Sequence, residues 1–167
     1  MPLDLPALLG SARLYASGLG IVLYSHELPQ TLLAAESEAD RSAVYDKALI
    51  DGRAVRIATG SPQLYYECVF SNQSLPNAAP IVAQTTFGLR LDGTNLGLCD
   101  GYAELDWSDE GYQHESIAVT PGSFRVDAYY LTGSRQPEDD MLLFFQLTAV
   151  STLAGLPSGT VELLFEL

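Results

Sequence analysis

The stretch IAVTPGSFRVDAYY, residues 117–130, decides the predicted fold of this chain. Two runs of alternating apolar and polar residues flank a Thr-Pro-Gly-Ser segment at residues 120–123. Proline presets φ for a tight turn and glycine tolerates positive φ, so a turn is expected there. After it, Phe124, Val126 and Ala128 share one face of a strand at period two. The pattern predicts a half-buried antiparallel hairpin.

The segments on either side repeat this pattern. Short apolar or aromatic runs recur roughly every 8–12 residues between turn residues, which is the signal for an all-β sandwich or barrel. The run at 141–150 is the most apolar and is predicted to form a central strand. We expect one domain over residues 1–167, an antiparallel, jelly-roll-like β-sandwich of roughly ten short strands.

One stretch, residues 30–43, has helical composition. Its apolar stripe is short, so it predicts at most one short helix or an ordered loop. Residues 43–50 are ambiguous. Lys47 and Ala48 favour a helix, but Asp-Gly at 51–52 between β-rich runs is a hairpin signal. We expect a strand at 43–50, with a helix as the alternative.

The charge of the chain is strongly negative. Asp and Glu number 21 against 8 Lys and Arg, a formal net charge of −13. Such a field repels nucleic acid and anionic membranes, so no direct binding to either is expected. The charge fits simple solubility, and it also fits a basic protein partner.

The two cysteines, Cys68 and Cys99, have no metal-ligand spacing. Each lies in an apolar run, which predicts buried, reduced thiols. The first residues lack a positively charged region, and Pro6 and Gly10 interrupt the early apolar stretch. No secretion signal is predicted, and we expect a cytoplasmic protein.

Several segments occur in the same order in a known group of proteins. A strand precedes a glycine turn at 53–60, a Val/Phe strand covers 64–70, AQTTF occupies 83–87, and PGSFRV occupies 121–126. Together with a last strand after an acidic loop, they resemble small bacterial β-sandwich proteins of the DNA-entry nuclease inhibitor (ComJ) and toxin-immunity type. The resemblance implies a non-enzymatic protein that binds another protein. It carries over no binding residue, and the first fifty residues do not share it.

Groups that could support catalysis are few. His26-Glu27 and His114-Glu115 are dipeptides, and strand neighbours point to opposite faces, so neither can chelate a metal through both side chains. No Gly-x-Ser-x-Gly motif is present. We expect no metal and no cofactor, and the residues favour a protein that is not an enzyme without deciding the question. The alternative is a hydrolase or carbohydrate-binding module that uses the loop around Trp107.

A binding surface follows if the chain from Thr86 onward is a plain meander, because alternate connections then share one end of the sheet. We call the resulting surface the acidic pole. It comprises Asp92, Trp107, Asp109, Glu110, Tyr112, Glu138, Asp139 and Asp140. Close carboxylates repel one another unless a cation meets them, and their field steers basic ligands. The first hypothesis is therefore an inhibitor or immunity-type protein that pairs with a basic protein. A structural domain that self-associates through a strand edge remains a further alternative, and the oligomeric state stays open.

Overall fold

The computed structural model describes residues 5–16, 20–60, 64–77, 79–101, 107, 114–131 and 140–164. These residues form ten strands and two helices, so the predicted all-β class is confirmed. The strands are β1 (Gly10–Ala16), β2 (Ile21–Ser25), β3 (Ala54–Ala58), β4 (Leu64–Ser71), β5 (Ile81–Leu91), β6 (Asn95–Asp100), β7 (His114–Ala118), β8 (Gly122–Leu131), β9 (Asp140–Val150) and β10 (Gly159–Glu162). The helices are α1 (Leu28–Leu33) and α2 (Glu38–Asp51).

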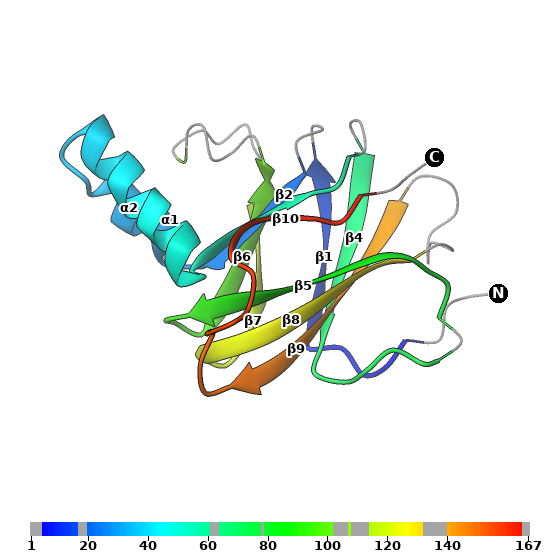
Figure 1. Ribbon diagram of the computed structural model, residues 1–167. Helices are drawn as coiled ribbons and strands as arrows, with labels where there is room; N and C mark the ends of the chain where they lie inside the picture. The colour runs from blue at the N-terminus through cyan, green and yellow to red at the C-terminus, as the bar shows by residue number, and fades with distance from the viewer. Residues whose placement is uncertain are drawn as a thin grey trace.

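The strands form two five-stranded sheets (Figure 1). Sheet A has the order β1-β4-β9-β8-β5, and sheet B has the order β10-β3-β2-β6-β7. Their inner faces pack into one apolar core that includes Phe70, Phe87 and Phe145. The central position of β9 in sheet A confirms the prediction made from the apolar run at 141–150.

The predicted hairpin at residues 120–123 is wrong. β7 belongs to sheet B and β8 to sheet A, so the Pro-Gly segment carries the chain from one sheet to the other. β8 pairs with β5 and β9 instead. The meander from Thr86 is wrong for the same reason, because β5 and β6 also lie in different sheets. Alternation along a strand determines which side chains are buried. The alternating pattern is the same whether the turn joins two paired strands or connects a strand of one sheet to a strand of the other.

The sheets are mixed rather than antiparallel. β4 runs parallel to β9, and β3 runs parallel to β10. Parallel strands need a long crossover connection, and many residues separate the two members of each pair. The antiparallel, jelly-roll-like arrangement that we predicted from sequential turns is corrected accordingly.

Residues 43–50 are helical, which corrects the predicted strand and the limit of one short helix. Ser37 caps α2, because its side chain accepts a hydrogen bond from the Asp40 backbone N–H at 3.1 Å. Gly52 ends the helix with a left-handed φ of 79°. The Asp-Gly pair at 51–52 therefore marks a helix C-terminus, where glycine is favoured because it has no Cβ.

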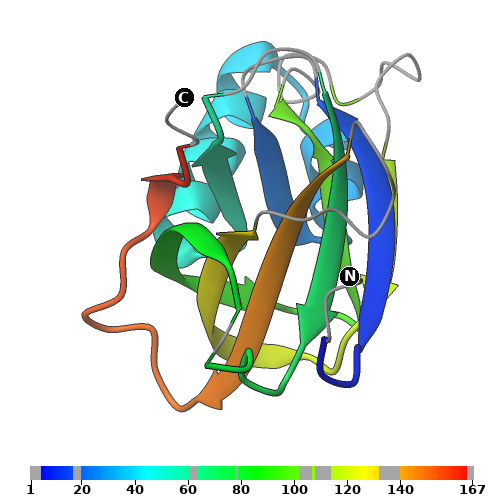
Figure 2. The same cartoon turned by 90° about the vertical axis from the view of Figure 1, so that its right-hand side faces the viewer.

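The two helices cover the outer face of sheet B (Figures 1 and 2). Leu28, Leu32, Tyr45 and Leu49 of the helices pack on strand residues that include Val22 and Cys99. On the other side of the sandwich, Leu5 and Leu75 cover part of sheet A. Part of each sheet is therefore buried on both faces, and the strands there do not alternate simply between apolar and polar residues.

Alternation along the strands of the sequence predicts an inward-facing core of seven residues, Phe124, Val126, Leu143, Phe145, Leu147, Val161 and Leu163, and six of these positions are confirmed. Val126, Leu143, Phe145, Leu147, Val161 and Leu163 are buried. Phe124 is half-buried at the start of β8, where it packs against the edge of the core. Both cysteines are buried free thiols, as predicted. Among the described residues, neither helix has the length and apolar character needed to cross a membrane.

Candidate functional site

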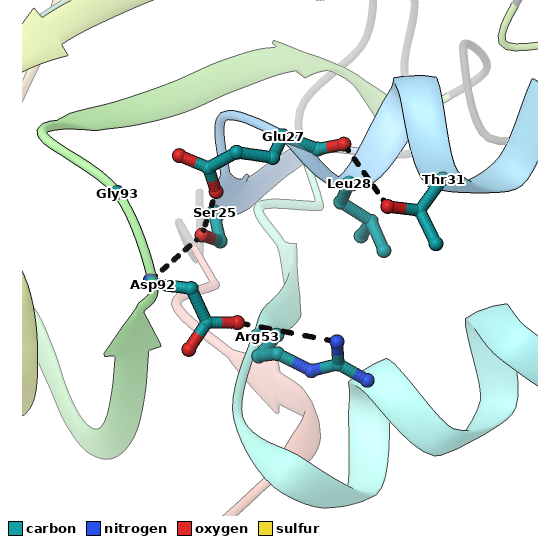
Figure 3. Close-up of a pocket in the computed structure, with 7 residues that line it drawn as sticks. All are labelled: Ser25, Glu27, Leu28, Thr31, Arg53, Asp92 and Gly93. Atoms are coloured by element: carbon teal, nitrogen blue, oxygen red, sulfur yellow. Dashed lines mark hydrogen bonds and ion pairs between the residues drawn. The ribbon is translucent and has the colours of Figure 1, made fainter.

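A small pocket opens where the turn from β2 into α1, the start of β3 and the turn from β5 to β6 meet (Figure 3). Its volume is about 210 Å³. The lining residues are Ser25, Glu27, Leu28, Thr31, Arg53, Asp92 and Gly93. Leu28 supplies an apolar wall, and the other side chains supply hydroxyl, carboxylate and guanidinium groups.

Ser25 ties the pocket together. It is 2% exposed, its hydroxyl donates a hydrogen bond to Glu27 Oε2 at 2.6 Å, and its Oγ accepts one from the Asp92 N–H at 3.0 Å. Gly93 permits this arrangement, because a Cβ at that position would overlap Glu27 Oε1. The end of β2 is thereby joined to the turn between β5 and β6, and the Glu27 carboxylate is held at one wall (Figure 3).

The charges around the pocket are unevenly matched. Arg53 lies 3.5 Å from an Asp51 oxygen and 4.0 Å from an Asp92 oxygen, and Arg90 lies 3.1 Å from the other Asp92 oxygen. These two arginines and two aspartates balance. Glu27 makes its hydrogen bond to Ser25 but has no basic side chain within ion-pair distance among the residues that the structure describes.

The arrangement favours binding over covalent chemistry. The Ser25 hydroxyl contacts a carboxylate as a nucleophile contacts its base, but it is buried and already holds both a donated and an accepted hydrogen bond. Among the described residues, no group of three or more His, Cys, Asp or Glu side chains is placed to hold a metal ion. What the pocket offers a ligand is a half-buried carboxylate beside an apolar wall.

Three members of the predicted acidic pole are described, and the structure does not bring them together. Asp92 lines the pocket, just beyond the end of β5, where Leu91 pairs with Gly122 at the start of β8. Asp140 begins β9, next to the end of β8, so these two aspartates lie at opposite ends of sheet A. The other five carboxylate and tyrosine positions, Asp109, Glu110, Tyr112, Glu138 and Asp139, lie outside the described residues.

Trp107 is a packing residue. It is 8% exposed on the outer face of sheet B, with ring centroids 5.3 Å from Tyr24 and 5.6 Å from Tyr45 of α2. His114 is next to it, and its Nδ1 lies 3.0 Å from the Tyr24 hydroxyl. Burial lowers the pKa of His114 and, in the opposite direction, raises the pKa of Tyr24. A buried ring is not available for stacking on a sugar, so the carbohydrate-binding alternative loses the exposed tryptophan that it needed.

Sequence reasoning missed Ser25, Glu27 and Arg53. In the sequence, Glu27 stands out only as half of a His-Glu dipeptide, and Arg53 only as part of a predicted strand. One signal was available, since Pro29 just after Glu27 is favoured in the first turn of a helix and places Glu27 at a helix start. Nothing in the sequence indicates that a turn more than sixty residues later completes the pocket.

Comparison with known proteins places the fold but not the activity. No protein-family model and no curated protein sequence matches this chain. Among solved structures, the chain is similar to a protein described as crocagin biosynthetic gene J, with a TM-score of 0.52 and 14% identity, over 87% of this chain and 98% of that one. ComJ, the inhibitor of the DNA-degrading activity of NucA from Bacillus subtilis, matches with a TM-score of 0.47 and 8% identity, over 89% of this chain and 100% of that one. The weak resemblance to ComJ-type proteins that the sequence predicted is thus also found in structure, and at these identities it concerns the fold alone.

Proposed function

We propose that this chain is a non-enzymatic acidic protein that binds a basic protein partner. The observation that carries the proposal is the net charge of −13, an excess of thirteen carboxylates over the basic groups of the same chain. A field of this size raises the local concentration of a basic partner and speeds its association.

Part of this charge lies on the helical face of the molecule. Glu36, Glu38, Asp40 and Asp46 are all exposed on or beside α2, and Lys47 is the exposed basic residue of that helix. The connections 107–114 and 132–140 hold Asp109, Glu110, Glu138, Asp139 and Asp140 and form the second acidic region in the sequence. We include both regions as candidate docking surfaces, the second being what remains of the acidic pole after Asp92 is assigned to the pocket.

The more specific form of the proposal is an inhibitor or immunity-type protein. The sequence resemblance around residues 121–126 suggests this form, and a β scaffold that presents polar connections is compatible with it. If a captured partner has nuclease or other toxic activity, addition of this chain in equal amounts should suppress that activity.

The test begins with affinity capture from native lysate at low and high salt, followed by association rates with the purified partner. We expect basic proteins to be retained at low salt and released at high salt, because added salt screens the attraction between charges. The Debye length is already about 8 Å at physiological ionic strength and falls further above it. Capture of no basic protein at low salt would overturn the proposal.

Two variants that remove equal charge locate the docking surface. One replaces Glu138, Asp139 and Asp140 with Asn and Ser. The other replaces Glu36, Glu38 and Asp46 with Gln and Asn. Both should fold, because neighbouring like charges repel one another and removing them costs little stability. The variant at the docking surface should slow association at low salt, and the difference should shrink as salt rises. If association at low salt is unchanged in the first variant, the acidic run at 138–140 is not the docking surface.

A further inference from the structure

We propose that the pocket of Figure 3 receives an arginine side chain of the protein partner, with Glu27 as the carboxylate that binds its guanidinium. This inference rests on the proposed function and adds a defined contact to it. A volume of about 210 Å³ is below the range of about 300–1,000 Å³ that is typical of pockets for drug-sized ligands. The pocket suits a single side chain better than a small molecule.

The charge of the pocket selects a cation. Arg53 is matched by Asp51 and Arg90 by Asp92, as the ion-pair distances show. The carboxylate left without a basic partner among the described residues is Glu27, and it is half-buried. A half-buried ion has lost part of its hydration, so a cation that reaches it is bound more strongly than one that meets a fully exposed carboxylate.

The geometry favours arginine. The Ser25 hydroxyl holds the Glu27 carboxylate in place by donating a hydrogen bond to Oε2 at 2.6 Å, and Gly93 leaves the space that Oε1 occupies. A fixed carboxylate suits the planar, forked donor of a guanidinium, which is also less strongly hydrated than an ammonium group. Leu28, which is 3% exposed, can pack against the aliphatic part of the incoming side chain.

The test uses the whole chain and two small probes, N-acetyl-arginine amide and the neutral isostere N-acetyl-citrulline amide. In a titration followed by ¹⁵N chemical shifts, the arginine probe should shift the amides of Ser25, Asp92 and Gly93 in a saturable way, with a Kd on the order of 1 mM, as befits a ligand of one residue. The citrulline probe should leave these amides unshifted at the same concentration.

Three variants complete the experiment. Glu27→Gln keeps the acceptor for Ser25 but removes the charge, and it should weaken the arginine probe about tenfold, which corresponds to the loss of one charged hydrogen bond. Gly93→Ala keeps the charge but displaces the carboxylate, and it should weaken the probe to a similar extent. Glu38→Gln removes the same charge from an exposed position on α2 and should leave the affinity unchanged.

Absence of saturable shifts at these three amides, or equal affinity in Glu27→Gln and the wild type, would overturn the assignment. Shifts spread over the exposed carboxylates and weakened equally by Glu38→Gln would also overturn it, since they would show general attraction of the probe to negative charge. If the wild type still captures a basic protein in a salt-dependent way, such a result would leave the protein-binding function standing and remove only the role of the pocket.

Discussion

Replacement of Phe145 by alanine tests the packing on which the sandwich depends. Phe145 is fully buried in β9, the central strand of sheet A, and its ring stacks on Phe70 of β4 with 4.9 Å between centroids and 14° between planes. Truncation of a buried phenylalanine to alanine lowers the free energy of unfolding by about 3–5 kcal/mol. The stacked pair accounts for about 0.5–1.5 kcal/mol of that loss. The residues around Phe145 lie on strands paired with β9 and can fill the resulting cavity only in part. We therefore expect a loss of about 3–5 kcal/mol in the free energy of unfolding.

Phe124→Ala is the matched control, because the sequence assigned both phenylalanines to the core and the structure separates them. Phe124 is half-buried at the start of β8, so its truncation should lower the free energy of unfolding by about 1–2 kcal/mol. Urea unfolding can be followed by the fluorescence of Trp107, the single tryptophan, which is buried between Tyr24 and Tyr45. A loss below about 1 kcal/mol for Phe145→Ala, or a larger loss for Phe124→Ala, would refute the face assignment of these strands.

The remaining predictions concern backbone conformation, thiols and pH. Gly52→Ala should lower the free energy of unfolding by about 1–2 kcal/mol because of the left-handed φ of Gly52, with a further loss because the added Cβ would contact a leucine side chain. Gly155 has a similar φ and open space around it, so Gly155→Ala should show only the loss due to φ in the same urea assay. Burial raises the pKa of the Cys68 thiol, so this residue should react with an alkylating reagent only in denaturant, and intact-mass analysis should find both cysteines reduced. Partial burial lowers the pKa of His114 below its ordinary value. As pH falls below about 6.5, protons therefore bind the unfolded chain preferentially and the free energy of unfolding decreases, and His114→Gln should reduce this loss.

The strands were predictable because their signal is local. Alternation along residues 124–130 and the apolar run at 141–150 each depend on a few neighbouring residues, and the structure has strands that include both. The choice of partners was not predictable in this way. Pairing of β8 with β5 rather than β7 depends on which sheet each strand joins, and a Pro-Gly turn is compatible with either path.

The second helix shows how two local signals compete. Ser37 and Asp40 form the Ser-x-x-acid pattern of a helix start, and Gly52 supplies the helix end. Asp-Gly at 51–52 is also a favoured hairpin turn, which is why the sequence predicts a strand where the structure has a helix. The burial of Tyr45 and Leu49 against sheet B is a tertiary contact that stabilises the helix and that the sequence does not display.

The pocket was beyond sequence reasoning for a geometric reason. Its polar side chains come from the segment that leads from the end of β2 into α1, from the residue before β3 and from the turn after β5, three segments that meet only once the sandwich has formed. Asp92 was assigned to a functional site, but to a surface with Asp140 at the other end of sheet A. That error follows directly from the meander, because the order of strands determines which turns become neighbours.

The position of β9 between β4 and β8 has a consequence for how the chain reaches its fold. Without β9 the pairs β1–β4 and β5–β8 have no hydrogen-bonded connection, and sheet B likewise obtains its edge strand β10 last, when Val161 pairs with Ile57. Such non-local, parallel pairing places folding in the slow range for domains of this size, on the order of milliseconds to seconds. During synthesis, the edges of β4 and β8 stay open until residues 140–150 have left the ribosome, so a nascent chain stalled before β9 is exposed to aggregation through these edges.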